Sequence, residues 1–208
     1  MKKMIIFDCD GVLVDSEIIA NRIDAEMLSE LGYAISTEES IKRFTGMSAA
    51  TVRDIVFEES GIILPEDLSD LTQKHILNAF EKELQPLMCE VLEHYPYMLK
   101  CVASSSPRAR VLKSLELTKQ DHFFTQESIF TSSQVKRGKP FPDLFLFAAQ
   151  QMGVSPQNCL VVEDSMAGIK AAQSAGMDVV GFLGGSHAGF DWYRHNIQLL
   201  DVPMCRSL

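Results

Sequence analysis

Four short apolar runs, each ending in a polar or glycine-rich cluster, constrain the fold of this chain more than any other feature. They are Met4–Phe7, Leu99–Ala103, Cys159–Val162 and Val179–Phe182. Short runs that are apolar at nearly every position suit strands covered on both faces, as in a parallel sheet. Helical patterns lie between them, over Arg108–Glu116, Asp143–Met152 and Ser165–Ala175. This alternation predicts an α/β fold, a doubly wound, Rossmann-like core with a mostly parallel sheet.

The first two predicted strands are separated by about ninety residues, whereas a plain βαβ unit needs about thirty. Three helical patterns fill this stretch: one from Ile19 to Leu31, one that Ser48 would cap, and one from Leu68 to Phe80. We therefore expect residues 16–84 to form an all-helical cap, inserted into a core made of residues 1–15 and 85–208. Ligands of open α/β sheets bind beyond the carboxyl ends of the strands, so such an insert would sit over the site.

Composition narrows the class of partner. The 208 residues carry a formal net charge of −9, which disfavours a nucleic-acid partner because phosphate backbones need a basic surface. No apolar run approaches the length that spans a membrane, and Asp8 and Asp10 interrupt the first one. The five cysteines are scattered without a CxxC pair, which favours reduced thiols. We expect a cytoplasmic protein, acting as a monomer.

Polar side chains near the ends of the predicted strands should meet in one crevice. They are Asp8, Asp10, Ser104, Lys139, Glu163 and Asp164. Four carboxylates in a dry cleft repel one another unless a cation lies among them, and oxygen ligands with several waters suit Mg²⁺. The hydroxyl and the ammonium group are suited to bind a phosphoryl group beside that metal.

These clusters resemble the four motifs of the haloacid dehalogenase superfamily, in order and over essentially the whole chain. The first is Asp8-Cys9-Asp10-Gly11 and the residues up to Ser16. The second is Ser104 after Val102-Ala103, the third is Lys139-Pro140, and the fourth is Glu163-Asp164-Ser165 with Ala167-Gly168. The resemblance is to the β-phosphoglucomutase-like branch of sugar-phosphate phosphatases. It implies a Mg²⁺-dependent phosphatase of small phosphate esters, with a helical cap.

The resemblance also implies a role for each residue of the first motif. Asp8 would attack phosphorus and form an aspartyl-phosphate. Asp10 would protonate the leaving alkoxide and then take a proton from the hydrolytic water. The two side chains would face the same way because alternate residues of an extended segment do so. Gly11 would let the backbone turn sharply where a side chain would crowd the phosphate.

The other three motifs would hold the metal and the phosphoryl group. By resemblance, Mg²⁺ is bound by Asp8, the backbone carbonyl of Asp10 and Asp164, with Glu163 directly or through water. Lys139 and Ser104 would bind phosphoryl oxygens. Ser104 is preferred because it follows the strand directly, but Ser105 or Ser106 could take that part.

Each of these residues also has a plain structural interpretation. A lone Asp-x-Asp-Gly is a common turn, and a lone Lys139 would be a solvated lysine. Glu163-Asp164 alone could cap the next helix, since acidic residues stabilise the first turn of a helix. We expect Asp15 to be structural, as a cap of the first insert helix, and His187 to be a surface histidine. The motifs gain their weight from occurring together.

We expect the residues that select the substrate to lie in the predicted cap. Arg43, beside Phe44 and Gly46, is similar to the pattern of sugar-acid phosphatases such as those acting on 6-phosphogluconate. A solvated arginine at a helix end explains Arg43 equally well. A phosphosugar mutase is the alternative function, but Ala20 and Ala49 occupy positions where such mutases place a histidine and an arginine.

Two further classes share part of this site. A dehalogenase in this fold needs neither Mg²⁺ nor the second aspartate, so Asp10 and Asp164 argue against it. A phospho-receiver signalling module also gathers acidic residues, a hydroxyl and a lysine around Mg²⁺. Such modules are shorter and carry no large insert between the first two strands, and an insert is typical of a lid that closes over a substrate.

Overall fold

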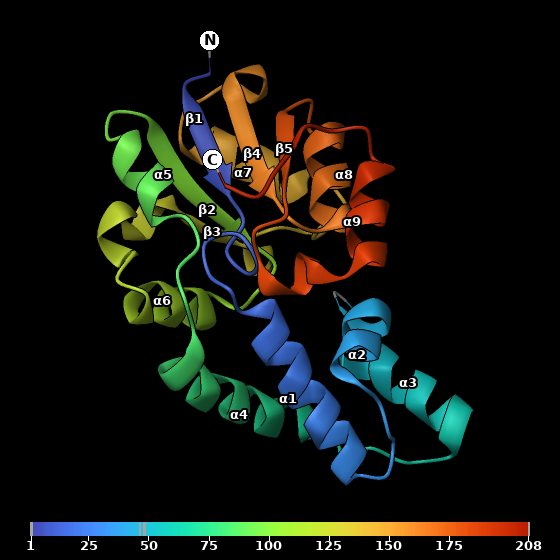
Figure 1. The fold of residues 1–208 in the computed structure, drawn as a ribbon. Coiled ribbons are helices and arrows are strands. Elements are labelled where there is room, and N and C mark those ends of the chain that lie inside the picture. Colours follow the sequence, from blue (N-terminus) through green and yellow to red (C-terminus); the bar gives the residue numbers. More distant parts are fainter. Residues whose placement is uncertain (1, 46, 48, 208) are drawn as a thin grey trace. The chain divides into compact units, whose positions relative to one another are not determined.

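The computed structural model describes residues 2–45, 47 and 49–207. Its chain divides into two compact units, Met1–Asp15 with Gln85–Leu208, and Ser16–Leu84. The first is an α/β unit and the second is helical (Figure 1). In the described part of the chain, no helix is both long and apolar enough to span a bilayer.

The α/β unit is built on one parallel sheet with the strand order β3-β2-β1-β4-β5-β6. The strands are β1 (Met4–Phe7), β2 (Leu99–Ser104), β3 (Ile129–Thr131), β4 (Cys159–Glu163), β5 (Asp178–Phe182) and β6 (Met204–Cys205). Strand β1 lies between β2 and β4, with Phe7 opposite both Val102 and Val162. The predicted fold class is therefore confirmed, and all four apolar runs are strands.

Helices of the α/β unit cover the sheet. They are α5 (Cys89–His94), α6 (Arg108–Leu117), α7 (Asp143–Gln151), α8 (Met166–Ser174) and α9 (Asp191–Gln198). Helix α7 packs on β2 and β3, and α8 packs on β4 and β5. Ile6, Phe145 and Ile169 belong to one hydrophobic core of buried residues. This core fixes the strand ends that carry the polar clusters.

The helical unit contains α1 (Glu17–Glu30), α2 (Thr37–Phe44), α3 (Ala49–Ser60) and α4 (Leu68–Glu83). Helix α2 was not predicted, although Ser36 and Glu39 form a capping box at its start. The unit has its own small core, formed by Leu28, Tyr33, Phe44, Val56 and Leu64. Ser48, the predicted cap of the second insert helix, lies outside the described residues.

Asp15 does not have the capping role we expected. Ser16 is the N-cap residue of α1, and its side chain makes no capping hydrogen bond. The Asp15 carboxylate instead accepts hydrogen bonds from the backbone N–H and the hydroxyl of Ser186. Asp15 thus ties the end of the first motif to the segment that follows β5, within the α/β unit.

Candidate active site

The carboxyl ends of two neighbouring strands bring three acidic residues together. Asp8 follows β1, Glu163 ends β4, and Asp164 comes directly after it. One carboxylate oxygen from each lies within 4.8 Å of the others, and all three residues are buried. Lateral pairing of β1 and β4 therefore creates the cluster, as the sequence predicted for neighbouring parallel strands.

Gly11 allows the backbone of the first motif to approach this cluster closely. Its φ angle is +76°, in the region that favours glycine. A Cβ atom at this position would lie 2.1 Å from Oδ2 of Asp164 and 2.8 Å from Cε1 of His187. A side chain at position 11 would therefore displace Asp164, which is a more specific reason than the crowding of phosphate that we expected.

Lys139 is the cation at the centre of the cluster. Its Nζ lies 2.7 Å from Oδ1 of Asp8 and 2.6 Å from Oε1 of Glu163, and its side chain is only 4% exposed. Burial alone lowers the pKa of Lys139, but attraction to Asp8 and Glu163 outweighs it and raises the pKa above its ordinary value. Lys139 is therefore a charged, inaccessible ammonium group, not a solvated lysine.

Asp8 lies in a strongly perturbed environment. Burial raises the pKa of its carboxyl well above the ordinary value, and the neighbouring Glu163, Asp164 and Asp10 raise it further, whereas Lys139 lowers it. Perturbation of this kind, produced by burial together with specific charged neighbours, is typical of functional carboxylates.

Glu163 is held in one orientation. Its Oε1 accepts from Lys139, and its Oε2 accepts from the backbone N–H of Ser165 at 2.7 Å and from the Ser165 hydroxyl at 3.0 Å. A Cβ atom on Gly168 would lie 1.7 Å from Oε1. The glycine of the fourth motif is thus needed because the first turn of α8 packs directly on this carboxylate.

The three consecutive serines after β2 have different environments. The Ser104 side chain is buried, and its Oγ accepts from the backbone N–H of Ser106 at 3.0 Å. Ser105 is exposed, and its carbonyl accepts from the Ser132 hydroxyl. The Ser106 hydroxyl donates to Oδ2 of Asp10 at 2.6 Å. Phosphate binding by Ser104 or Ser105 stays a prediction, whereas Ser106 contacts the second aspartate.

Arg110 is a site residue that sequence reasoning missed. Its Nη2 lies 3.1 Å from Oδ1 of Asp10, and the two side chains are 13% and 9% exposed. It lies in the first turn of α6, which begins just after the serine run. The only signal in the sequence was its short distance from the second motif, and an arginine on a helix is more often solvated.

His187 was wrongly predicted to lie on the surface. It is 1% exposed, and its Nε2 lies 2.8 Å from Oδ2 of Asp164. The ring packs edge-on against Tyr193, whose hydroxyl donates to the backbone carbonyl of Asp164. A carboxylate that contacts a buried imidazole on one side keeps a fixed orientation toward the rest of the cluster.

The family of the chain follows from its sequence and this geometry together. A family model described as haloacid dehalogenase-like hydrolase matches residues 5–182, a range that contains all four motifs. The chain belongs to the haloacid dehalogenase-like hydrolases. The predicted family and the predicted hydrolase class are confirmed, and the phospho-receiver alternative is wrong.

Several curated relatives in this family match over most of their length. The chain is 33% identical over 190 residues to 6-phosphogluconate phosphatase of Escherichia coli, covering 88% of this chain and 83% of the relative. It is 30% identical over 196 residues to β-phosphoglucomutase of Bacillus subtilis, covering 86% and 82%. It is 28% identical over 181 residues to fructose-1-phosphate phosphatase of Escherichia coli, covering 85% and 94%.

Solved structures of other haloacid dehalogenase-like proteins share the fold. A protein of unknown function from Agrobacterium tumefaciens superposes with a TM-score of 0.86 at 34% identity, covering all of this chain and 93% of that one. A family hydrolase from Deinococcus radiodurans, solved with bound phosphate and sodium, gives a TM-score of 0.78 at 28% identity, covering 100% and 90%.

The predicted specificity residues of this haloacid dehalogenase-like hydrolase lie in its helical unit. Arg43 forms an ion pair with Glu59 at 2.6 Å, and its guanidinium lies over the ring of Phe44, 5.0 Å from the centroid. Glu59 also accepts from the Tyr33 hydroxyl. Arg43 is therefore engaged within its own unit. Its contact with substrate stays a prediction, and Gly46 lies outside the described residues.

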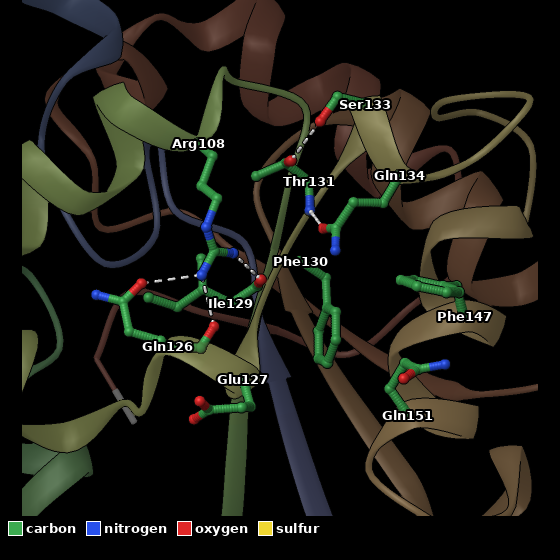
Figure 2. A pocket seen from close by; sticks show the side chains of 10 residues that line it. All are labelled: Arg108, Gln126, Glu127, Ile129, Phe130, Thr131, Ser133, Gln134, Phe147 and Gln151. Carbon is green, nitrogen blue, oxygen red and sulfur yellow. Dashed lines mark hydrogen bonds between the residues drawn. The ribbon is translucent and has the colours of Figure 1, made fainter.

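A hollow of about 360 Å³ beside β3 contains none of the predicted site residues (Figure 2). Phe130 and Phe147 form part of its lining. The Arg108 guanidinium in this hollow donates to the backbone carbonyls of Gln126 and Ile129 and to the Gln126 side chain (Figure 2). These bonds tie α6 to the segment before β3, which is a structural role.

Proposed function

We propose that this chain is a Mg²⁺-dependent phosphatase that hydrolyses small phosphorylated sugars or sugar acids, such as 6-phosphogluconate, through an aspartyl-phosphate on Asp8. The observation that carries the proposal is the environment of the Asp8 carboxylate. It contacts Lys139 and lies in one cluster with Glu163 and Asp164, and Asp10 lies two residues along the chain. A nucleophile, a fixed positive charge and a second carboxylate are what phosphoryl transfer through aspartate requires.

The residues present fit a divalent cation. Four carboxylates, those of Asp8, Asp10, Glu163 and Asp164, face two cationic side chains, Lys139 and Arg110. The carboxylates outnumber the cationic side chains, and the donor atoms are all oxygens, as Mg²⁺ prefers.

Within this cluster the metal would be held by Asp8, Asp164 and the backbone carbonyl of Asp10, with Glu163 directly or through water. When bound, Mg²⁺ would supply positive charge that orients the phosphoryl oxygens and offsets the charge that develops on them.

The first half-reaction would transfer the phosphoryl group to the enzyme. Asp8 forms a bond to phosphorus while the bond between phosphorus and the leaving oxygen breaks. The proton on the Asp10 carboxyl group moves to the leaving oxygen, which departs as an alcohol. Lys139 and Ser104 would bind the phosphoryl oxygens, so the charge on them is stabilised by groups held in place.

The second half-reaction would release inorganic phosphate. A water oxygen forms a bond to phosphorus, and the bond from phosphorus to Asp8 breaks. Asp10, now a carboxylate, accepts the proton of that water and returns to the form in which it began. Neither half-reaction needs a reactant other than the phosphate ester and water, and the residues that take part all belong to the α/β unit.

A mutase is the second candidate function, and the 30% identity to a β-phosphoglucomutase favours considering it. Ala20 and Ala49 lack the polar side chains that the mutase resemblance requires at these positions. We therefore expect hydrolysis. The test is to incubate the enzyme with β-glucose 1-phosphate and a trace of the corresponding bisphosphate. Glucose 6-phosphate formed faster than inorganic phosphate would show a mutase.

The chain contains no disulfide among its described residues, and its five cysteines are free thiols. Burial raises the pKa of the Cys9 thiol well above its ordinary value, so this neighbour of Asp8 is an inert neutral thiol. These thiols fit a protein that acts in the reducing cytoplasm, where we propose that it acts as a monomer.

The decisive assay is a panel of phosphorylated metabolites, measured as phosphate release with Mg²⁺ and with EDTA. We expect hydrolysis of sugar or sugar-acid phosphates, loss of activity with EDTA, and a loss of about 10³-fold or more in Asp8→Asn. Asp54→Asn makes the same chemical change on an exposed residue of α3 and should be as active as the wild type. Full activity in Asp8→Asn would refute the nucleophile assignment.

A further inference from the structure

The Asp10 carboxylate is held at both of its oxygens. The Ser106 hydroxyl donates to Oδ2 at 2.6 Å, and the Arg110 guanidinium contacts Oδ1 at 3.1 Å. Asp10 is 7% exposed, and the Arg110 side chain is 13% exposed, so water competes little for these contacts. Charge-assisted hydrogen bonds in such surroundings are stronger than those between neutral groups.

The two donors are themselves fixed by local structure. The backbone N–H of Ser106 donates to the Ser104 side chain, which orders the turn after β2. Pro107 is the N-cap residue of α6, and Arg110 therefore lies in the first turn of that helix. One short segment thus carries both the predicted phosphate ligand Ser104 and the two groups that contact Asp10.

Arg108, two residues earlier, shows that the contact of Arg110 is specific to its position. Arg108 donates to Gln126 and to the carbonyl of Ile129, beside β3 (Figure 2). Residues two apart on a helix do not share a face. The two arginines at the start of α6 therefore reach different places, and only Arg110 contacts a predicted catalytic carboxylate.

We infer that Ser106 and Arg110 are positioning residues that hold the Asp10 carboxylate in place for proton transfer. The inference rests on the proposed function, since it assigns these residues to the acid-base aspartate of that reaction. Both groups donate to the carboxylate oxygens, and these contacts fix the direction in which the oxygens point. Asp10 must present an oxygen to the water that attacks the aspartyl-phosphate, so hydrolysis of this intermediate is the step that depends most on them.

p-Nitrophenyl phosphate separates the two half-reactions. Its leaving group departs readily without a proton, so formation of the aspartyl-phosphate needs Asp10 little, whereas its hydrolysis still needs Asp10 as a base. Rapid mixing of Arg110→Ala or Ser106→Ala with this substrate and Mg²⁺ should give a burst of nitrophenolate close to one equivalent per enzyme. Steady-state turnover after the burst should be about 10- to 100-fold slower than in the wild type.

Lys113→Ala is the matched control, because Lys113 lies on the same helix and pairs with Glu116 instead of a site residue. It should match the wild type in turnover. The inhibition constant of inorganic phosphate should stay within about three-fold of wild type in Arg110→Ala, because the phosphoryl ligands are intact. Arg110→Lys should recover part of the turnover, since an ammonium group keeps the charge but not the planar fork.

Two results would overturn the inference. One is turnover in both Arg110→Ala and Ser106→Ala equal to that of Lys113→Ala. The other is a burst amplitude that falls in parallel with turnover, since this would show a loss of intact sites and not of proton transfer. Failure of the wild type itself to hydrolyse any phosphate ester would instead refute the proposed function, so the two failures are distinguishable.

Discussion

Both units of this hydrolase have ion pairs on their surface, but among the described residues only the α/β unit has a buried cluster of charged side chains. In the α/β unit, Asp8, Asp10, Glu163 and Asp164 are at most 7% exposed, and they contact a lysine, an arginine and a histidine. In the helical unit, three ion pairs connect charged residues of the four helices, and each side chain in these pairs is at least 33% exposed.

This difference indicates where the chemistry lies. Burying a charge costs free energy that even a good partner only partly returns, so a buried cluster of ions is poor evidence for a stabilising role. Exposed ion pairs contribute little either way, about 0–1 kcal/mol each. The costly arrangement in the α/β unit is therefore explained by function, whereas the surface pairs of the helical unit can change at little cost.

Lys139→Met should have the largest effect among the variants that test this contrast. The substitution keeps the volume but leaves Asp8 and Glu163 without their cation, and kcat/KM should fall about 100-fold or more. Thermal unfolding should also show a loss of stability of about 3–5 kcal/mol. Lys82→Met, at the exposed end of α4, should change stability by less than about 0.5 kcal/mol. Equal effects of the two variants would remove the distinction between the units.

Gly168→Ala tests how tightly the α/β unit packs around Glu163. Alanine in a helix interior normally stabilises by about 0.5–1 kcal/mol relative to glycine. Here the added Cβ would lie 1.7 Å from Oε1, so we expect a net loss of about 1–3 kcal/mol together with a clear loss of activity.

Gly189→Ala is the matched control for Gly168→Ala, because a Cβ atom at position 189 would meet no described heavy atom within 4 Å. Its stability in thermal unfolding should be within about 0.5 kcal/mol of the wild type. If Gly168→Ala were the more stable and fully active variant, the position of Glu163 described above would be wrong.

His187→Ala should weaken metal binding without removing a predicted ligand. Loss of a group that orients a metal ligand typically lowers affinity about 10- to 100-fold, and His187 contacts Asp164. Calorimetric titration with Mg²⁺ in the absence of substrate measures this directly. His195→Ala changes an exposed histidine of α9 and should bind Mg²⁺ as the wild type does. Identical affinities in the two variants would show that His187 has only a packing role.

Arg43→Ala should have the smallest effect on stability, below about 1 kcal/mol, because its ion pair with Glu59 is exposed. If Arg43 binds the acidic end of a substrate, kcat/KM should fall about 10-fold for 6-phosphogluconate but not for neutral glucose 6-phosphate. Arg22→Ala removes two comparable surface pairs in the same unit and serves as the control. Parallel changes on both substrates would exclude Arg43 as a specificity residue.

The contrast between the units also explains what the sequence could predict. The strands β1, β2, β4 and β5 were found because each contains a short, mainly apolar run. Strands β3 and β6, with three and two residues, are too short to show a pattern. In the helical unit α2 was missed even though its capping box is visible in the sequence, because the apolar face of an eight-residue helix is short.

The candidate site followed the same rule. Asp8 and Glu163 could be predicted because they lie at the ends of predicted strands, and Lys139 because it stands before Pro140 in a motif of the family. His187 and Arg110 could not, since their burial depends on contacts between segments far apart in the chain. The His187 ring packs closely against the backbone at Gly11 and Gly185, where a Cβ atom would overlap it. A single sequence does not reveal such packing.

Chemical trapping of the intermediate tests the central claim most directly. Asp10→Asn, which should slow hydrolysis of the aspartyl-phosphate, is mixed with p-nitrophenyl phosphate and Mg²⁺ and quenched with borohydride, which reduces an acyl phosphate to an alcohol. Peptide mass spectrometry should find homoserine in place of Asp8, and only when substrate was present. The account would be contradicted if the wild type turned over the substrate but the quenched Asp10→Asn variant carried no such modification at position 8.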